Sequence, residues 1–343
     1  MIAEDRKILI KEHGETRGKK LWFPGRNGRL GRSCRKPTLH WSEVVLLNSV
    51  LLFISLITVV FNLLIIISVS HFRQLHTPTN ILLLSLGVSD FFVGLLLMPF
   101  EIYRFTFCWF LGDAMCVLLC FLICNLISAS IWNIVLISVD RCIAICYPLH
   151  YPTRISLTRI KYCVCLCWFC ASSCSFVYSN DMMVQSGRSN SCIGECKFII
   201  SYILGTFDLI FNFILPVMII IVLYLRVFVV AVSQARSMRS HITVGTFHSA
   251  TSRTKRSELK AARTLGVLVV VYLMCYCPYY CYSLVGISLT NTSYSFSLFF
   301  LGYVNSCLNP VIYALFYPWF RKAVKIIVTL QILQPGSREA NIL

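Results

Sequence analysis

The sequence predicts an all-α membrane protein: a seven-transmembrane helix bundle with a short amphipathic helix after the seventh segment. Of its 343 residues, 57% are hydrophobic and only 13% are charged, whereas a soluble protein carries about 25% charged residues. The apolar residues gather in seven runs, each long enough to cross a bilayer as a helix. The only charged residues inside these runs are Asp90 and Asp208. Because a charge at membrane depth is costly, we expect each to have a specific role.

The first run, residues 44–70, is too long for the apolar core of a signal peptide, so we expect a transmembrane helix there. The other six runs are 79–100, 114–139, 162–180, 198–225, 264–290 and 293–319. A short turn near Asn291 separates the last two and carries the sequon Asn291-Thr292-Ser293 in an outer loop. Beyond the seventh run, Trp319, Phe320 and Ala323 recur at helical spacing among basic residues, which predicts a helix lying on the lipid of the inner leaflet.

Basic residues predict the orientation. The loops after the first, third and fifth runs and the tail after the seventh hold 17 Lys and Arg, against 3 in the opposite loops. The positive-inside rule therefore places the amino terminus outside and the carboxyl terminus in the cytoplasm. The tail opposes this with 11 basic residues, and we weigh two interpretations of it: a solvated basic segment or an error in the gene prediction. The chain divides into an extracellular tail (1–43), a seven-helix domain (44–319) and a cytoplasmic helix and tail (320–343).

Composition also excludes several classes of function. The formal charge of +17 is spread over the tail and the loops of one side, which favours a membrane surface over nucleic acid. We find no Ser/His/Asp or metal-ligand spacing, so we expect neither an enzyme nor an organic cofactor. A transporter or channel would suit the intramembrane acids, but the odd helix count and the lack of an internal repeat oppose it.

Short motifs occur at defined places in the runs. The third run ends in Asp140-Arg141-Cys142, and the sixth contains Cys275-Tyr276-Cys277-Pro278. The seventh contains Asn305-Ser306-Cys307-Leu308-Asn309-Pro310-Val311-Ile312-Tyr313. With Asn62, Asp90, Trp168, Pro216 and Tyr224, this set resembles the rhodopsin-like G-protein-coupled receptors over most of the chain.

Two stretches narrow the resemblance. The run 71–80, and the seventh-segment pattern that continues through Tyr317, Trp319 and Phe320, are similar to the trace amine-associated receptors, especially the fish olfactory members. This resemblance implies a plasma-membrane receptor in chemosensory neurons. It also implies amine odorants as ligands and a stimulatory heterotrimeric G protein that raises cAMP.

The resemblance implies a switch at the cytoplasmic ends of the helices. Arg141 is held beside Asp140 in the inactive state and turns to the G protein in the active state. Glu258, at the foot of the sixth run, is a second candidate partner of Arg141, and Tyr224 and Tyr313 belong to the same switch. The alternative is an interfacial ion pair with no switching role. Cys142 departs from the family, in which Tyr is usual.

The resemblance further implies a sodium ion at Asp90. Ser130, Asn305, Ser306 and Asn309 stand at the positions that surround this ion in related receptors, and all carry oxygen atoms suited to a hard cation. The alternative is a buried carboxyl group bonded to water and side chains without an ion.

Two further features follow from the resemblance. Tyr276 replaces the usual Trp under the ligand, and Pro278 is expected to kink the sixth helix, since proline removes a backbone hydrogen bond. Cys116 and Cys196 match the disulfide of the whole class. Cys34 and Cys192 match an extra tail-to-loop disulfide of the trace amine-associated receptors, and Cys108 is left over as a free thiol.

The expected ligand site lacks the usual acid. Most amine receptors carry Asp in the third helix, where this chain has Ile123. Asp208 lies eight residues before Pro216, about two turns nearer the outside, and we expect it to bind the ammonium group instead. The alternative is a structural Asp bonded to neighbouring polar groups.

Other side chains extend the site. Glu101 lies about three turns from Asp90 near the outer mouth, so a diamine bridging Asp208 and Glu101 is one hypothesis and a water-exposed rim residue is the other. Tyr279, Tyr280 and Tyr303 offer aromatic faces to a cation, or pack between helices. A receptor for a non-amine ligand remains an alternative because of Ile123, and so does a chain that is not functional as written.

Overall fold

The structure is a computed structural model that describes residues 41–188, 196–198, 200–242, 249–284 and 292–342. These residues form helices and short connections and contain no strand. Most of the amino-terminal tail, with Cys34, lies outside the described residues, as do Cys192 and the sequon at Asn291.

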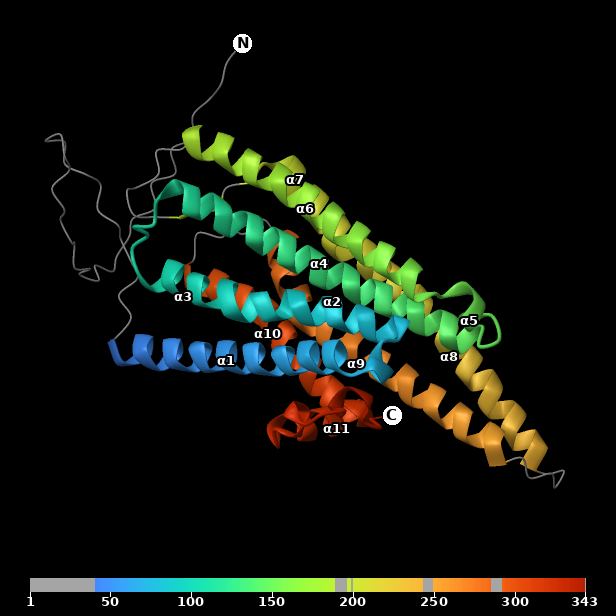
Figure 1. Cartoon of the computed structure of the whole chain (residues 1–343). Helices are drawn as coiled ribbons and strands as arrows, with labels where there is room; N and C mark the ends of the chain where they lie inside the picture. The colour runs from blue at the N-terminus through green and yellow to red at the C-terminus, as the bar shows by residue number, and fades with distance from the viewer. Residues whose placement is uncertain (1–40, 189–195, 199, 243–248, 285–291, 343) are drawn as a thin grey trace, which may run out of the picture.

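Seven membrane segments pack side by side as a bundle, which confirms the predicted fold class (Figure 1). Six helices or helix series are long and apolar enough to cross a membrane, and the seventh is the first arm of a bent pair. In chain order the segments are α1 (Trp41–His71); α2 (Pro78–Phe92), η2 (Val93–Leu97) and α3 (Met98–Thr106); α4 (Gly112–Cys146); α6 (Leu157–Arg188); α7 (Tyr202–Leu209), η3 (Ile210–Ile214) and α8 (Leu215–Ile242); α9 (Ser249–Leu284); and α10 (Thr292–Phe316).

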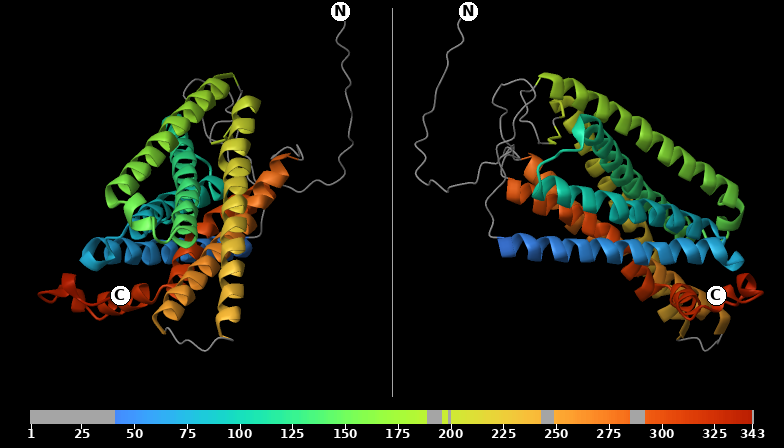
Figure 2. Two further views of the ribbon diagram at one scale, coloured as in Figure 1. Left: turned by 90° about the vertical axis from the view of Figure 1, so that its right-hand side faces the viewer. Right: turned by 60° about the vertical axis from the view of Figure 1, so that its left-hand side comes forward.

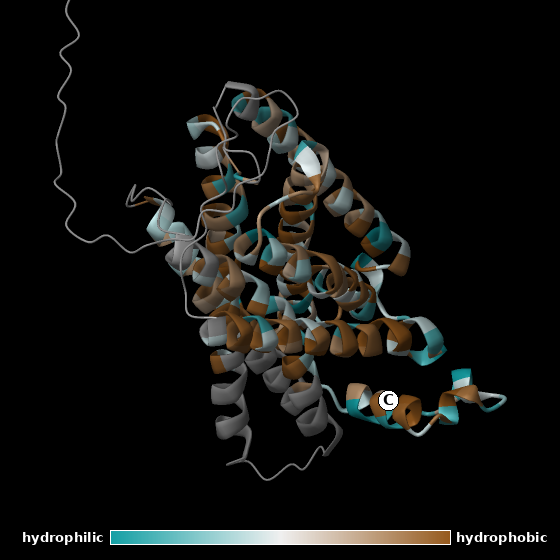
Figure 3. Cartoon of the chain, turned by 90° about the vertical axis from the view of Figure 1, so that its left-hand side faces the viewer, coloured by the Kyte–Doolittle hydropathy of each residue, from teal (hydrophilic) through white to brown (hydrophobic). Residues whose placement is uncertain are grey.

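The outer faces of the helices are apolar. Phe53 on α1 is 61% exposed and Phe169 on α6 is 70% exposed, and apolar residues predominate over the helices in Figure 3. In a soluble protein such a surface would drive aggregation, but lipid chains solvate it. Polar side chains face inward instead: Asn62, Asp90 and Asn305 are fully buried.

The second and fifth segments each contain a π-helical turn just before a proline. η2 precedes Pro99, and η3 precedes Pro216. Proline has no N–H to donate, and a π turn accommodates that gap without ending the helix. The second segment therefore runs on through Pro99 to Thr106, six residues beyond the expected end at residue 100.

A glycine allows close packing beside the first of these turns. A Cβ at Gly94 would lie 3.0 Å from side-chain atoms of Thr58 on α1, and the Ser55 hydroxyl donates to the Gly94 carbonyl at 2.7 Å. Small residues and interhelical hydrogen bonds are the usual means of packing helices in a membrane.

The seventh segment ends earlier than expected. α10 stops at Phe316 and α11 (Pro318–Val328) starts at an angle of 94° to it, so Trp319 belongs to the amphipathic helix and not to the membrane segment. Pro318 at the first helical position is preorganised to begin a helix, and the residue before a proline disfavours helical geometry. Figure 2 shows α11 turning away from the bundle axis. Its apolar side chains Trp319, Phe320 and Ala323 are buried against the bundle.

Candidate functional site

A cavity of about 300 Å³ lies among the outer halves of the helices. Its walls come from α4, α6, the α7–η3 turn, α9 and α10, together with the chain just before α7. The described residues that line it are mostly apolar or aromatic: Cys120, Ile123, Cys124, Ile127, Ser128, Tyr178, Phe198, Ile200, Gly205, Asp208, Leu209, Asn212, Tyr276, Tyr279, Tyr280, Ser283, Leu298, Phe299 and Gly302.

Asp208 is the one acidic side chain among the described residues that line this cavity. Its Oδ1 accepts a hydrogen bond from the Asn212 side-chain amide at 2.8 Å, and its Oδ2 accepts one from the Tyr280 hydroxyl at 3.3 Å. Both donors are neutral, so the described residues around Asp208 stabilise its carboxylate by dipoles and bring no cation to it. Such an arrangement can bind a cationic ligand at low desolvation cost to the carboxylate.

Aromatic side chains surround the carboxylate. The Tyr280 ring stacks on Phe213 with centroids 4.5 Å apart, and Tyr279 meets Tyr280 edge-on at 5.0 Å. Of the six expected ligand residues, Asp208, Ile123, Tyr279 and Tyr280 line the cavity, whereas Glu101 and Tyr303 do not. Tyr303 is buried against Phe300 instead.

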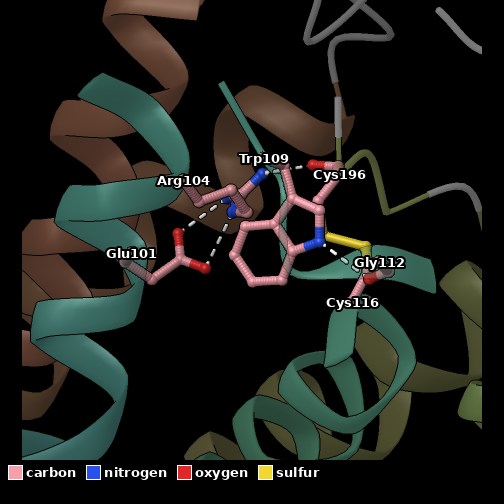
Figure 4. Close-up of a disulfide and its surroundings, with 6 residues drawn as sticks. All are labelled: Glu101, Arg104, Trp109, Gly112, Cys116 and Cys196. Atoms are coloured by element: carbon pink, nitrogen blue, oxygen red, sulfur yellow. Dashed lines mark hydrogen bonds and ion pairs between the residues drawn. A yellow bond between two sulfur atoms is a disulfide. The ribbon is translucent and has the colours of Figure 1, made fainter. Parts of the chain in front are cut away.

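Glu101 is neither a cavity residue nor a water-exposed rim residue. It is fully buried, and Arg104 donates to both its oxygens, at 2.9 Å from Nε and 2.6 Å from Nη2 (Figure 4). Both hypotheses for Glu101 overlooked this partner, although the i, i+3 spacing within one helix is a known signal for an ion pair.

The floor of the cavity is formed by α9. Tyr276 lines it, and the Tyr276 ring lies close to Gly302 of α10, where a Cβ would stand 3.6 Å from it. One turn below, the Tyr272 ring lies 5.0 Å from that of Tyr276. Pro278 is inside α9, between Tyr276 and the tyrosines beside Asp208.

A second polar cluster surrounds Asp90. Ser130 and Ser306 donate to its Oδ1 at 3.1 and 2.8 Å, and the Asn309 amide donates to its Oδ2 at 2.8 Å. The Asn305 side chain is fully buried, and neither its oxygen nor its nitrogen has a hydrogen-bond partner among the described residues. The structure thus brings three of the four expected residues to Asp90, two through hydroxyl groups and Asn309 through its amide nitrogen, and it leaves the buried Asn305 amide with unused bonding capacity.

At the cytoplasmic end, Arg141 is paired with Asp140. The guanidinium donates to Asp140 Oδ2 at 2.6 and 3.0 Å and also to the Thr79 hydroxyl. Asp140 accepts two more hydrogen bonds at 2.8 Å, one from Thr79 and one from the Tyr151 hydroxyl. Burial raises the pKa of Tyr151 above its ordinary value, so this phenol stays protonated and able to donate.

The other expected switch residues are partly described. Tyr224 lies on α8 with its ring over Gly266 of α9, where a Cβ would be 3.1 Å from its hydroxyl. Tyr313 is buried on α10, and its hydroxyl has no partner among the described residues. Glu258 lies on α9 in a stretch whose side chains are outside the description, so its contact with Arg141 stays a prediction.

The expected bridge between Cys116 and Cys196 is present, and its sulfur atoms connect α4 to the segment before α7 (Figure 4). Cys108 is also in a disulfide, so the expectation of a left-over thiol is wrong. Its partner is outside the described residues, as are Cys34 and Cys192, and the predicted pair between those two is not described.

The sequence analysis missed several residues that complete these sites. Asn212 and Arg104 follow acids at i+4 and i+3, so helical spacing alone could have found them. Thr79 and Tyr272 come from elements distant in the sequence, and Tyr151 comes from the short helix after α4, so only tertiary packing brings the three to their partners.

Comparisons with known proteins agree with this architecture. The family model described as 7 transmembrane receptor (rhodopsin family) matches residues 61–313. The chain is 38% identical over 330 residues to trace amine-associated receptor 13c of zebrafish, which covers 93% of this chain and 95% of that one. It is 36% identical to mouse trace amine-associated receptor 1, over 88% and 95% of the two chains. It is also 36% identical to chimpanzee trace amine-associated receptor 6, over 94% and 95%.

The family match covers well over half of the chain, and these relatives align with nearly all of it. Such receptors are multi-pass proteins of the plasma membrane that respond to a small-molecule ligand and act on a heterotrimeric G protein, and they are not enzymes. The chain therefore belongs to the rhodopsin family of seven-transmembrane receptors and, within it, to the trace amine-associated receptors.

Proposed function

We propose that this receptor detects small amines as odorants, that Asp208 binds their ammonium group, and that it signals through a stimulatory G protein to raise cAMP. The observation that carries the proposal is that Asp208 is the one carboxylate in the otherwise neutral, largely apolar and aromatic lining that the structure describes. The names of the relatives, trace amine-associated receptors, support an amine as the ligand. A cavity of about 300 Å³ is at the small end of ligand pockets, which suits a small molecule.

The ligand would gain from three kinds of contact. Asp208 supplies the opposite charge, and the Tyr279 and Tyr280 rings supply aromatic faces worth about 0.5–2 kcal/mol each. Ile123, which replaces the usual acid of the third helix, contacts the carbon body of the ligand. Charge recognition thus moves from the third helix to the fifth, while the third supplies an apolar wall.

A continuous set of contacts leads from Asp208 toward the sixth helix. Asn212 donates to Asp208 through its side chain, and its backbone carbonyl accepts the Tyr272 hydroxyl of α9 at 3.1 Å. A cation drawn to Asp208 therefore acts on the same turn that holds α9. If the active state brings α7 and α9 closer around the ligand, the ligand binds that state better and shifts the population toward it. Pro278 is the point at which α9 can pivot.

The cytoplasmic half supplies the switch in this proposal. Arg141 is held by Asp140 and Thr79, and movement of α9 frees it for the G protein, together with Tyr224 and Tyr313. Glu258 is proposed as the second partner of Arg141 in the inactive state.

A sodium ion suits the cluster around Asp90. The carboxylate, the hydroxyl oxygens of Ser130 and Ser306 and the amide oxygens of Asn305 and Asn309 are hard ligands for such a cation. The Asn305 side chain supports this, because it is buried and has no hydrogen-bond partner among the described residues, and such an amide is destabilising unless an ion or water satisfies it. A bound sodium ion would supply positive charge against Asp90 in the inactive state.

The test is cAMP accumulation in cells that express the receptor, measured for a panel of amines against wild type and Asp208→Asn. We expect the variant to raise the half-maximal concentration at least about a hundredfold, equivalent to about 2.7 kcal/mol. Asp181→Asn is the matched control, because Asp181 does not line the cavity and accepts the Ser201 N–H at 2.7 Å.

Surface expression is measured by an extracellular epitope tag. An amine response that Asp208→Asn leaves unchanged contradicts the proposed site. A surface-expressed receptor that answers no amine contradicts amine recognition and favours a non-amine ligand.

A further inference from the structure

The outer end of α3 carries a fully enclosed ion pair between Glu101 and Arg104. The side chain of Glu101 is 0% exposed and that of Arg104 only 10%. Two parallel hydrogen bonds, of 2.9 and 2.6 Å, join the guanidinium to the two carboxylate oxygens. This bidentate geometry is among the strongest arrangements of such a pair.

Further contacts fix Arg104 in this position. Its Nη1 donates to the carbonyl of Cys196 at 3.2 Å, and Cys196 is bonded to Cys116 at the start of α4 (Figure 4). The guanidinium also lies over two aromatic rings, 4.1 Å from the centroid of Phe105 and 4.4 Å from that of Phe198. These contacts hold the cation against Glu101 from several sides.

The pair stands beside the ligand cavity but does not open into it. Phe198, which packs on Arg104, is one of the cavity walls, whereas neither Glu101 nor Arg104 lines the cavity. The charge of Glu101 is therefore cancelled before a ligand arrives. Asp208, whose described hydrogen-bond donors are the neutral Asn212 and Tyr280, is left as the only uncompensated carboxylate of the described lining.

We propose that the ligands of this receptor carry a single ammonium group on an apolar body, and that the Glu101–Arg104 pair excludes α,ω-diamines. A second ammonium group would lie in a cavity whose described lining offers no second carboxylate, and Glu101 beside that lining is already paired with Arg104. The desolvation of that second charge would go uncompensated. This inference rests on the proposed role of Asp208 and specifies the ligand class of that site.

The test compares matched probes that differ only in the second amine: pentylamine with pentamethylenediamine, and hexylamine with hexamethylenediamine. In wild-type cells we expect the half-maximal concentration for cAMP to be at least about tenfold higher for each diamine than for its monoamine. Arg104→Gln keeps an amide that can donate to the Cys196 carbonyl but releases the charge of Glu101. We expect this variant to lower the half-maximal concentration for each diamine about tenfold and to change that for each monoamine less than about threefold.

A second pair of variants applies where Arg104→Gln does not reach the cell surface. Glu101→Gln leaves the positive charge of Arg104 unbalanced beside the cavity, so we expect the half-maximal concentration for each monoamine to rise about tenfold. The double variant Glu101→Gln/Arg104→Gln removes both charges, and we expect it to restore the wild-type half-maximal concentration for the monoamines. Such charge rescue distinguishes an electrostatic role of the pair from a purely structural one.

Three results would overturn the inference: a wild-type receptor that prefers diamines, a diamine response that Glu101→Gln abolishes, or probe ratios that none of these variants changes. Failure of the proposed function looks different, because then no amine acts or Asp208→Asn has no effect. A diamine response that requires both Asp208 and Glu101 would contradict only the single-ammonium inference.

Discussion

At the scale of single residues, Asp140 is the centre of the cytoplasmic network. Its side chain is 1% exposed and accepts hydrogen bonds from Arg141, Thr79 and Tyr151. A carboxylate that accepts this many hydrogen bonds is fixed in place and in turn fixes the guanidinium. The same buried geometry makes the loss of one partner costly for the other, since an unpaired buried charge is left behind.

We therefore expect Asp140→Asn to raise basal signalling in the absence of ligand. The variant keeps the size of the side chain but removes the charge that retains Arg141, so the inactive state loses about 1–3 kcal/mol relative to the active one. Basal cAMP per receptor at the cell surface is the measurement. Tyr151→Phe is the matched control, because it removes one hydrogen bond to Asp140 and leaves the ion pair, and its basal signal should rise less. Equal basal signals in Asp140→Asn and wild type would contradict a restraining role.

Sequence reasoning about single residues is most informative where a residue type is unusual for its surroundings. An acid in an apolar run, such as Asp90 or Asp208, demands a partner, and spacing along one helix gives its depth. Glu101 shows the limit. Its distance from Asp90 indicated a shared face, but which face meets the cavity depends on the π turn η2 between them, which adds a residue and shifts the phase. The pairing with Arg104 then decides its charge.

At the scale of elements, prolines open the helices to contacts from their neighbours. Pro216 cannot donate to the carbonyl of Asn212, and the Tyr272 hydroxyl of α9 donates to that carbonyl at 3.1 Å. Pro310 likewise cannot donate to the carbonyl of Ser306, and the Asn62 amide of α1 donates there at 3.1 Å. A residue that weakens one helix thereby provides an acceptor through which another helix is attached.

Tyr272→Phe tests this view of the α8–α9 contact. Loss of the hydroxyl leaves the Asn212 carbonyl without that bond, so we expect the free energy of unfolding to fall by about 0.6–1.7 kcal/mol, the range for interhelical hydrogen bonds in membranes. The measurement is thermal unfolding of the purified receptor in detergent. Tyr303→Phe is the matched control: Tyr303 is equally buried, but its hydroxyl has no partner among the described residues. Equal losses in the two variants would show that the hydroxyl of Tyr272 is not the cause.

Element boundaries were the least predictable part of the sequence. Hydropathy located all seven segments, because the bilayer fixes their minimum length. It placed the end of the seventh at Trp319, whereas the helix stops at Phe316. Hydropathy does not distinguish a helix that continues from one that turns at Pro318 and lays the same apolar residues against the bundle.

At the scale of the whole molecule, the cluster around Asp90 lies between the outer cavity and the cytoplasmic network of Arg141. This residue is on α2, and its hydrogen-bond donors come from α4 and α10, so the cluster joins three segments at once. The ligand cavity lies on its outer side and the Arg141 network on its cytoplasmic side. A change that favours one packing of these helices at either end must pass through their shared contacts, which makes the cluster a natural site for an ion to bias the equilibrium.

Sodium and amine should therefore oppose each other. If sodium binds the inactive packing at Asp90 and the amine binds the active one, each weakens the other by the same factor, because binding free energies are reciprocally coupled. We expect amine affinity in isolated membranes to rise about fivefold or more when sodium chloride is replaced by potassium chloride at equal ionic strength. Asp90→Asn should abolish this difference. Ser89→Ala, at a neighbouring residue whose hydroxyl donates to the Leu86 carbonyl and not to Asp90, should keep it. A sodium effect that survives Asp90→Asn would place the ion elsewhere, and no sodium effect in the wild type would leave Asp90 as a hydrogen-bonded carboxyl that acts through its three donors alone.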